Sequence, residues 1–208
     1  MSKAKKALVV LTTFWDADAL INNGYFVFTV NNSVYQANLF TDEENKPTYT
    51  VNSVALSHPS FSKFNHIKSI DRLDFWCPTY NILNDYHKDR DWDKYIPRYE
   101  ALMKKRKETI RNWIESLVPN HIYILCCWEN TSKKGHCHRQ LIYKALQSSS
   151  LAKEKLFPLY RDGSNKREGE AKAIPLNNHE HIMQLPSIEP VDFSQVSEGP
   201  SAWDNMPF

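Results

Sequence analysis

Two short motifs of reactive side chains flank a polar loop in the middle of the chain. Cys127 and Glu129 close an apolar run, and Cys137, His138 and Arg139 open a segment with helical periodicity. A thiol, a carboxyl group, an imidazole and a guanidinium are the groups that nucleophilic catalysis, proton transfer and phosphate binding employ. Brought together, they would form a catalytic or anion-binding site.

Each of these residues has a functional and a structural interpretation. Cys137 stands at the expected helix start, where the helix dipole and Arg139 favour its thiolate, so it is either a nucleophile or a small packing residue. Arg139 and the free N–H groups of the helix start could bind phosphate or carboxylate, or Arg139 could form a salt bridge with Glu129. Glu129 is a candidate general acid or base. His138 is either a proton shuttle or a hydrogen-bonded core histidine.

Zinc binding is a separate possibility at the same place. Cys127, His136, Cys137 and His138 offer suitable ligand types, but their spacing matches neither a paired-cysteine framework nor a zinc finger. We therefore expect no metal or other cofactor, with Cys127 and His136 in supporting roles; a zinc-stabilised adaptor is the alternative. A cysteine-phosphatase loop beginning at Cys127 would need an arginine six residues later, where Lys133 stands.

The elements around the motifs predict a strand–loop–helix junction. Residues 122–127 are apolar and bounded like a buried strand, and residues 130–135 are polar and turn-forming. The segment that follows has Leu141, Ile142 and Leu146 at helical spacing. Because ligands bind at the carboxyl ends of strands in open α/β sheets, this junction is the expected site.

The rest of the chain predicts a mixed sequence of strands and helices. The expected strands are residues 6–13, 25–30, 33–40, 48–56 and 122–127, and the further expected helices are residues 16–22, 80–86 and 96–118. Asn31-Asn32 between two alternating runs favours a β-hairpin, and Pro97 suits the first turn of the longest helix. We expect a three-layer α/β fold with a mainly parallel central sheet, flanking helices and an extra β-hairpin near the N-terminus.

Composition sets the class of protein. Of 208 residues, 41% are hydrophobic, which is enough for one domain with a real core. No apolar run approaches the roughly 20 residues of a membrane span, and the N-terminus lacks the features of a signal peptide. Among the four cysteines, Cys126 and Cys127 are adjacent, which argues against a disulfide framework and for a reducing, cytoplasmic setting.

Charge divides the chain into a basic body and an acidic end. Residues 1–172, the expected α/β domain, contain 26 Lys and Arg against 19 Asp and Glu, a net charge of +7. The expected tail, residues 173–208, is rich in Pro and Ser and carries −5. Such a division is common in proteins that contact nucleic acid, although ordinary surface solvation explains it too. The basic run at residues 104–107 is either a solvated helix face or a phosphate contact.

The two motifs resemble the signature of the YeaO-like family, also known as domain of unknown function 488. That signature is a strand ending in Cys-x-Glu, here residues 127–129, followed by Cys-His-Arg at a helix start, here residues 137–139. Residues 53–61 and 73–103 are similar to the family's upstream segments. The resemblance covers roughly residues 6–148. It implies a compact α/β domain with a mainly parallel sheet, and it implies no particular reaction.

The last eleven residues, EGPSAWDNMPF, are similar to the C-terminal tip of bacterial single-stranded DNA-binding proteins, which docks genome-maintenance enzymes. On this resemblance Phe208 would enter an apolar pocket while its carboxylate meets an arginine, and Asp204 would add electrostatic attraction. The expected docking residues are Trp203, Asp204, Pro207 and Phe208. A tail packed on its own domain is the alternative.

Together these features predict a protein of DNA metabolism, of a kind that phages and mobile elements encode. Its nucleotide or nucleic-acid substrate would place a phosphate at the Cys137–Arg139 helix start, with Glu129 as acid or base. The tip would dock a replication or repair protein, and the basic body could contact nucleic acid. The alternative is a non-catalytic binding protein or inhibitor that captures a host DNA-processing protein through its tip.

Overall fold

A five-stranded parallel sheet forms the centre of the computed structural model, which describes residues 6–30, 33–40, 48–57, 59–60, 63–129, 131 and 135–161. The strands follow the order β5-β4-β6-β1-β7, and each neighbouring pair is parallel. Their bounds are β1 (Ala7–Thr13), β4 (Tyr49–Ser53), β5 (Asp71–Arg72), β6 (Ile122–Cys127) and β7 (Leu156–Tyr160). The central strands β1 and β6 are almost wholly buried, as parallel strands covered on both faces are.

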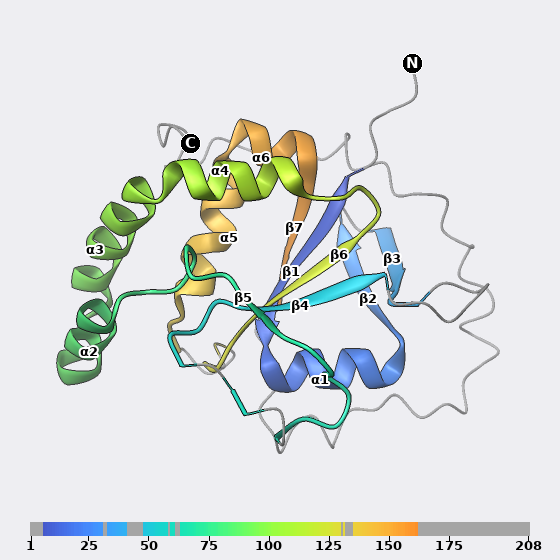
Figure 1. The fold of residues 1–208 in the computed structure, drawn as a ribbon, viewed down its shortest axis with the longest axis horizontal. Helices are drawn as coiled ribbons and strands as arrows, with labels where there is room; N and C mark the ends of the chain where they lie inside the picture. The colour runs from blue at the N-terminus through green and yellow to red at the C-terminus, as the bar shows by residue number, and fades with distance from the viewer. Residues whose placement is uncertain are drawn as a thin grey trace.

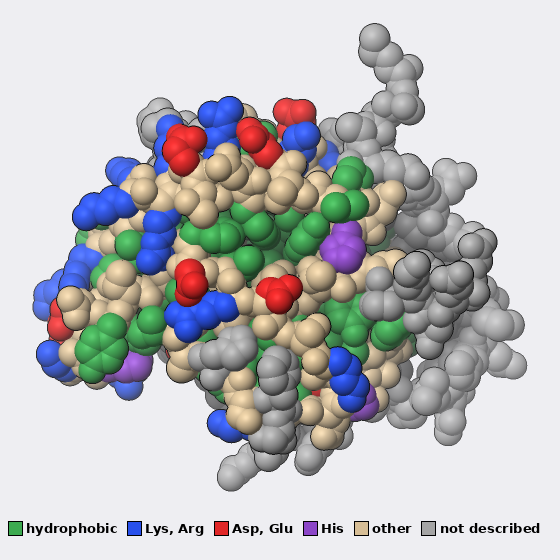
Figure 2. All heavy atoms as spheres, viewed as in Figure 1, with side chains coloured by type: hydrophobic (Ala, Val, Ile, Leu, Met, Phe, Trp, Pro, Cys, Tyr) green, Lys and Arg blue, Asp and Glu red, His purple; other side chains and the backbone are tan. Residues whose placement is uncertain are grey.

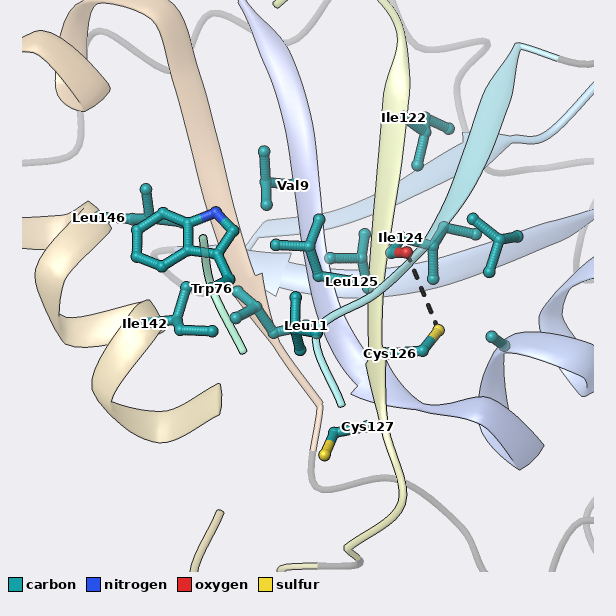
Figure 3. Close-up of a cluster of buried hydrophobic side chains, with 14 of the residues drawn as sticks. Val9, Leu11, Trp76, Ile122, Ile124, Leu125, Cys126, Cys127, Ile142 and Leu146 are labelled. Atoms are coloured by element: carbon teal, nitrogen blue, oxygen red, sulfur yellow. Dashed lines mark hydrogen bonds between the residues drawn. The ribbon is translucent and has the colours of Figure 1, made fainter. Parts of the chain in front are cut away.

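Helices cover both faces of this sheet, which confirms the predicted three-layer α/β fold (Figure 1). The helices are α1 (Phe14–Asn23), α2 (Tyr80–Asp89), α3 (Trp92–Lys105), α4 (Lys107–Ser116), α5 (His138–Ser148) and α6 (Ser150–Lys155). Figure 3 shows Leu11 and Leu125 of the sheet lying with Ile142 and Leu146 of α5 and with Trp76. On the opposite face, α1 packs against β1 and β6.

The predicted β-hairpin is confirmed as a separate two-stranded sheet. Its strands are β2 (Tyr25–Val30) and β3 (Ser33–Asn38), which pair antiparallel. Gly24 joins α1 to β2 in the left-handed conformation, with φ of 77°, and its N–H caps the helix by donating to the carbonyls of Leu20 and Ile21. The expected turn at Asn31-Asn32 lies outside the described residues.

The single helix expected over residues 96–118 is wrong, because the segment forms two helices. The first, α3, begins at Trp92, where the Asp91 side chain accepts a hydrogen bond from the N–H of Lys94 at 3.1 Å. Pro97 therefore lies inside α3 and not in its first turn. The strong N-cap five residues upstream decided the start of the helix, and the proline was accommodated within it.

The basic run at residues 104–107 coincides with the boundary between these helices. Arg106 separates α3 from α4, and its Nη1 donates to the backbone carbonyls of Phe75 and Cys77. Lys104 and Lys105 are exposed. Figure 2 shows Lys and Arg side chains, with Asp and Glu among them, along the left and upper margins of the molecule, where α2, α3 and α4 lie. The run is thus partly structural and partly solvated.

No pattern in the sequence predicted β5, α6 or β7. In β7, Pro158 interrupts the pattern of a buried strand, but β7 lies at the edge of the sheet and, among the described residues, pairs with β1 alone. An edge strand tolerates a proline, since one side of it donates no hydrogen bond to a neighbour.

A half-buried ion pair lies at the edge of the sheet where β1 and β7 end. Arg161 follows β7 and donates to the Asp16 carboxylate from Nε at 2.7 Å and from Nη2 at 3.0 Å. The Thr12 hydroxyl donates to the same carboxylate. The backbone carbonyl of Arg161 in turn accepts a hydrogen bond from Arg139, so this pair supports the candidate site.

The expected acidic tail, residues 173–208, lies outside the described residues, and with it the docking residues Trp203, Asp204, Pro207 and Phe208. Within the described ranges, no helix is both long and apolar enough to cross a membrane.

Candidate functional site

The two reactive motifs meet at the carboxyl end of β6, as the sequence predicts. The Cys127 thiol donates to Glu129 Oε2 at 2.7 Å, and Cys137 Sγ lies 3.4 Å from the same oxygen. Figure 3 shows Cys126 and Cys127 leaving β6 toward opposite faces, with Cys127 on the side of α5. The alternation of side chains along the strand therefore puts Cys127 in the site and excludes Cys126 from it.

Cys137 is the centre of this cluster. It is the N-cap residue of α5, it is 2% exposed, and its Sγ accepts a hydrogen bond from Arg139 Nε at 3.4 Å. Burial alone would raise the pKa of this thiol, but the neighbouring Cys127 side chain and the positive charges of His138 and Arg139 hold it well below its usual range. These surroundings favour a thiolate, which a mere packing residue does not need.

His138 is oriented by a backbone carbonyl. Its Nε2 lies 2.8 Å from the oxygen of Val54, which only accepts hydrogen bonds, so Nε2 carries a proton and Nδ1 faces Cys137 Sγ at 3.9 Å. Burial would lower the pKa of this imidazole, but the charge and hydrogen bond of Cys137 and the charge of Glu129 raise it. His138 is therefore a hydrogen-bonded core histidine that keeps its positive charge to a higher pH than usual beside Cys137.

Glu129 is the half-buried residue of the cluster, and its carboxyl group is the candidate proton donor. Burial, and then the negative charge of Cys137, raise the pKa of its carboxyl group. Burial also raises the pKa of Cys127, which keeps that side chain a neutral thiol and a hydrogen-bond donor. A carboxyl group that keeps its proton to a higher pH than usual, beside a thiol that loses its proton at a lower pH than usual, is the arrangement expected of a general acid and its nucleophile.

Arg139 links the two motifs and the end of β7 through hydrogen bonds to three acceptors. It has no exposed surface, and it donates from Nη2 to the backbone carbonyl of Glu129 and from Nη1 to that of Arg161 at 3.4 Å. Its bond is thus to the carbonyl of Glu129, not the salt bridge to the Glu129 carboxylate that the sequence left open. The nearest anion to Arg139 is the Cys137 thiolate, and direct binding of a substrate phosphate stays a prediction.

Three of the four candidate zinc ligands converge. The donor atoms of Cys127, Cys137 and His138 lie within 4.8 Å of one another, a spacing compatible with a metal ion held by two sulfurs and a nitrogen. His136 does not join them, because its exposed ring stacks on Trp92 with centroids 4.8 Å apart. Cys127 lies within the cluster, and His136 lies at its rim. The supporting roles expected of both residues stay predictions.

The aromatic side of α3 packs against the reactive cluster without belonging to it, and the sequence did not indicate this contact. Trp92, Tyr95 and Tyr99 follow helical spacing and stack in turn on one another. The Tyr99 hydroxyl donates to the carbonyl of Trp76 at 2.7 Å, and its ring lies 5.5 Å from that of His138. No sequence motif distinguishes an aromatic stripe beside a site from one in an ordinary core.

Residues 67–150 match the family model described as the active DUF488-N3 subclade. Both reactive motifs lie inside this range, so the predicted resemblance to domain of unknown function 488 is confirmed there. The resemblance expected of residues 6–66 stays a prediction. Neither the curated proteins nor the solved structures gave a match.

Proposed function

Since residues 67–150 match the active DUF488-N3 subclade, we propose that this chain is an enzyme whose nucleophile is Cys137 and whose substrate is a nucleotide or nucleic acid. One observation carries the proposal: Cys137 Sγ lies 3.4 Å from Arg139 Nε, 3.4 Å from Glu129 Oε2 and 3.9 Å from His138 Nδ1. Two cationic groups stabilise the sulfur anion while a carboxyl group stands ready to transfer a proton.

The chemistry that suits this arrangement is displacement at phosphorus. The Cys137 thiolate attacks the phosphorus atom, a sulfur–phosphorus bond forms, and the bond to the leaving oxygen breaks as Glu129 gives that oxygen its proton. The Glu129 carboxylate then takes a proton from a water molecule, which attacks phosphorus and releases the thiolate. Free N–H groups in the first turn of α5 face the phosphate oxygens during both steps.

The assignment to DNA metabolism rests on the charge pattern and the tail. The basic body of residues 1–172 suits a polyanionic substrate, and the acidic residues 173–208 end in the sequence that resembles a docking tip. We further propose that the protein acts in the cytoplasm, on DNA of a phage or mobile element. Its tail would recruit a replication or repair protein.

Alkylation kinetics test the nucleophile without a known substrate. We expect iodoacetamide to label Cys137 in the folded protein at rates that differ less than threefold between pH 6 and pH 8, because a thiol with a lowered pKa stays ionised across that range. The alkylation rate of a thiol with an ordinary pKa would fall roughly 75-fold from pH 8 to pH 6, because its thiolate fraction falls by that factor. Mass spectrometry assigns the labelled residue. The control Cys126→Ser, on the other face of the sheet, should leave the rate unchanged, and a rate that follows the ordinary thiol would contradict the proposal.

Protection by ligands extends the same assay to the substrate. Orthovanadate, a mimic of the transferring phosphoryl group, and short oligonucleotides should slow the alkylation of Cys137. Metal analysis of the purified protein accompanies it, because a zinc ion on Cys127, Cys137 and His138 would occupy the nucleophile. About one zinc per chain would favour the zinc-stabilised adaptor instead.

The second candidate function, a non-catalytic docking protein, is favoured by the tail sequence alone. We expect Phe208→Ala to abolish the capture of a DNA replication or repair enzyme from a bacterial lysate, because a terminal aromatic ring is the apolar anchor of such a tip. Phe193→Ala, in the same tail, is the matched control and should capture the enzyme as the wild type does. Equal capture by both variants would show that the terminal sequence does not dock the enzyme.

A further inference from the structure

Tyr95 carries a buried hydroxyl group with no partner among the described residues. The side chain is 3% exposed, and its oxygen has neither a hydrogen-bond donor nor an acceptor within reach. Leaving such a group unpaired in the interior is costly, and in native proteins it commonly marks a place where a ligand or water completes the bond. What could complete the bond depends on the residues that surround the Tyr95 ring.

The stack of rings along α3 runs beside the segment that carries Cys137. Trp92 stacks on His136 and Tyr99 lies against His138, with ring centroids 4.8 Å and 5.5 Å apart. Tyr95 lies between Trp92 and Tyr99 and stacks on both, at 4.8 Å and 5.8 Å. The two flanking rings therefore contact the residues on either side of Cys137.

The charges that act on Tyr95 agree with this placement. Burial raises the pKa of its phenol, and the negative charge of Cys137 is the largest electrostatic influence that raises it further. The phenol thus stays protonated at physiological pH and is available as a hydrogen-bond donor.

The geometry points to Tyr95 as a further catalytic residue, which donates a hydrogen bond to a substrate oxygen bound over Cys137. This inference rests on the proposed phosphoryl chemistry and adds to it the group that stabilises the oxygen on which charge accumulates. Arg139 is fully buried beneath the thiolate, so a donor on the α3 side is what a bound phosphate lacks.

The test compares Tyr95→Phe with Tyr99→Phe. Orthovanadate protects Cys137 from iodoacetamide in the wild type, and in Tyr95→Phe the concentration that halves the rate should rise at least tenfold. Without vanadate, the alkylation rate should stay within twofold, because no hydrogen bond joins Tyr95 to Cys137. In the control Tyr99→Phe, which loses the bond to Trp76, the vanadate concentration should be unchanged.

Thermal unfolding separates this role from a structural one. Tyr95→Phe should melt at the same temperature as the wild type or above it, since the substitution removes an unpaired buried hydroxyl, whereas Tyr99→Phe should melt lower. A melting temperature of Tyr95→Phe below that of the wild type would overturn the catalytic assignment of Tyr95. So would vanadate protection of Tyr95→Phe equal to that of the wild type. Either result would leave the proposed function standing. A wild type that vanadate does not protect would overturn both.

Discussion

Replacing Arg139 with methionine should lower the free energy of unfolding by about 3–5 kcal/mol, the largest effect we expect on stability from one substitution. The guanidinium has no exposed surface, and it holds the carbonyls of Glu129 and Arg161 together with the sulfur of Cys137. Methionine fills much of the space but leaves all three acceptors without a donor in the interior. Urea denaturation followed by circular dichroism measures the loss.

Arg111→Met is the matched control, because Arg111 is an arginine on an exposed helix face that pairs only with Glu115. Its loss should change the free energy of unfolding by less than about 0.5 kcal/mol. Arg139→Lys separates charge from hydrogen bonding, since lysine keeps the positive charge but loses the planar fork of donors. An Arg139→Met protein within about 1 kcal/mol of the wild type would contradict the view that this residue ties the junction.

Substituting Glu129 by glutamine should lower kcat by about 10²–10⁴-fold, the largest effect on activity that we expect with the fold intact. Glutamine has nearly the same shape but has no proton to give to the leaving oxygen. Alkylation of Cys137 should persist, because Arg139 and His138 still stabilise the thiolate. The assay follows the turnover of the nucleotide or oligonucleotide that protects Cys137.

The pH dependence gives this prediction a direction. The raised pKa of Glu129 keeps its carboxyl group protonated to a higher pH than usual, so the wild type should lose activity as pH rises through that pKa. Glu129→Gln should lack this decline. Glu100→Gln is the control, because burial also raises the pKa of Glu100, which is on α3 outside the cluster. Turnover by Glu129→Gln at the wild-type rate would contradict the role of general acid.

The local patterns of the sequence were enough to locate the candidate site. An apolar run of six residues, a polar link and a helical repeat each depend on neighbouring residues, so β6, the loop and the start of α5 could be predicted without the fold. β1, the hairpin of β2 and β3, and the general α/β class could also be predicted from the sequence, because the periodicities of strands and helices extend over only a few neighbouring residues.

Element boundaries were less predictable where two local signals compete. Pro97 favoured a helix start, but the Asp91 cap placed it at Trp92, and the break at Arg106 has no strong signal in the sequence. The edge strand β7 was missed because Pro158 is a breaker in a central strand and harmless at an edge. Whether a strand is central or at an edge is a property of the sheet.

The sequence by itself determined which reactive groups the chain carries, and where strand, loop and helix follow one another. Only the tertiary structure decided that Arg139 bonds to a carbonyl of Glu129 and not to its carboxylate, that His136 stacks on Trp92, and that the hydroxyl of Tyr95 is buried without a described partner. The physical reason is distance along the chain. Secondary structure follows from neighbours, whereas hydrogen bonds, burial and shifted pKa values depend on residues that only folding brings together.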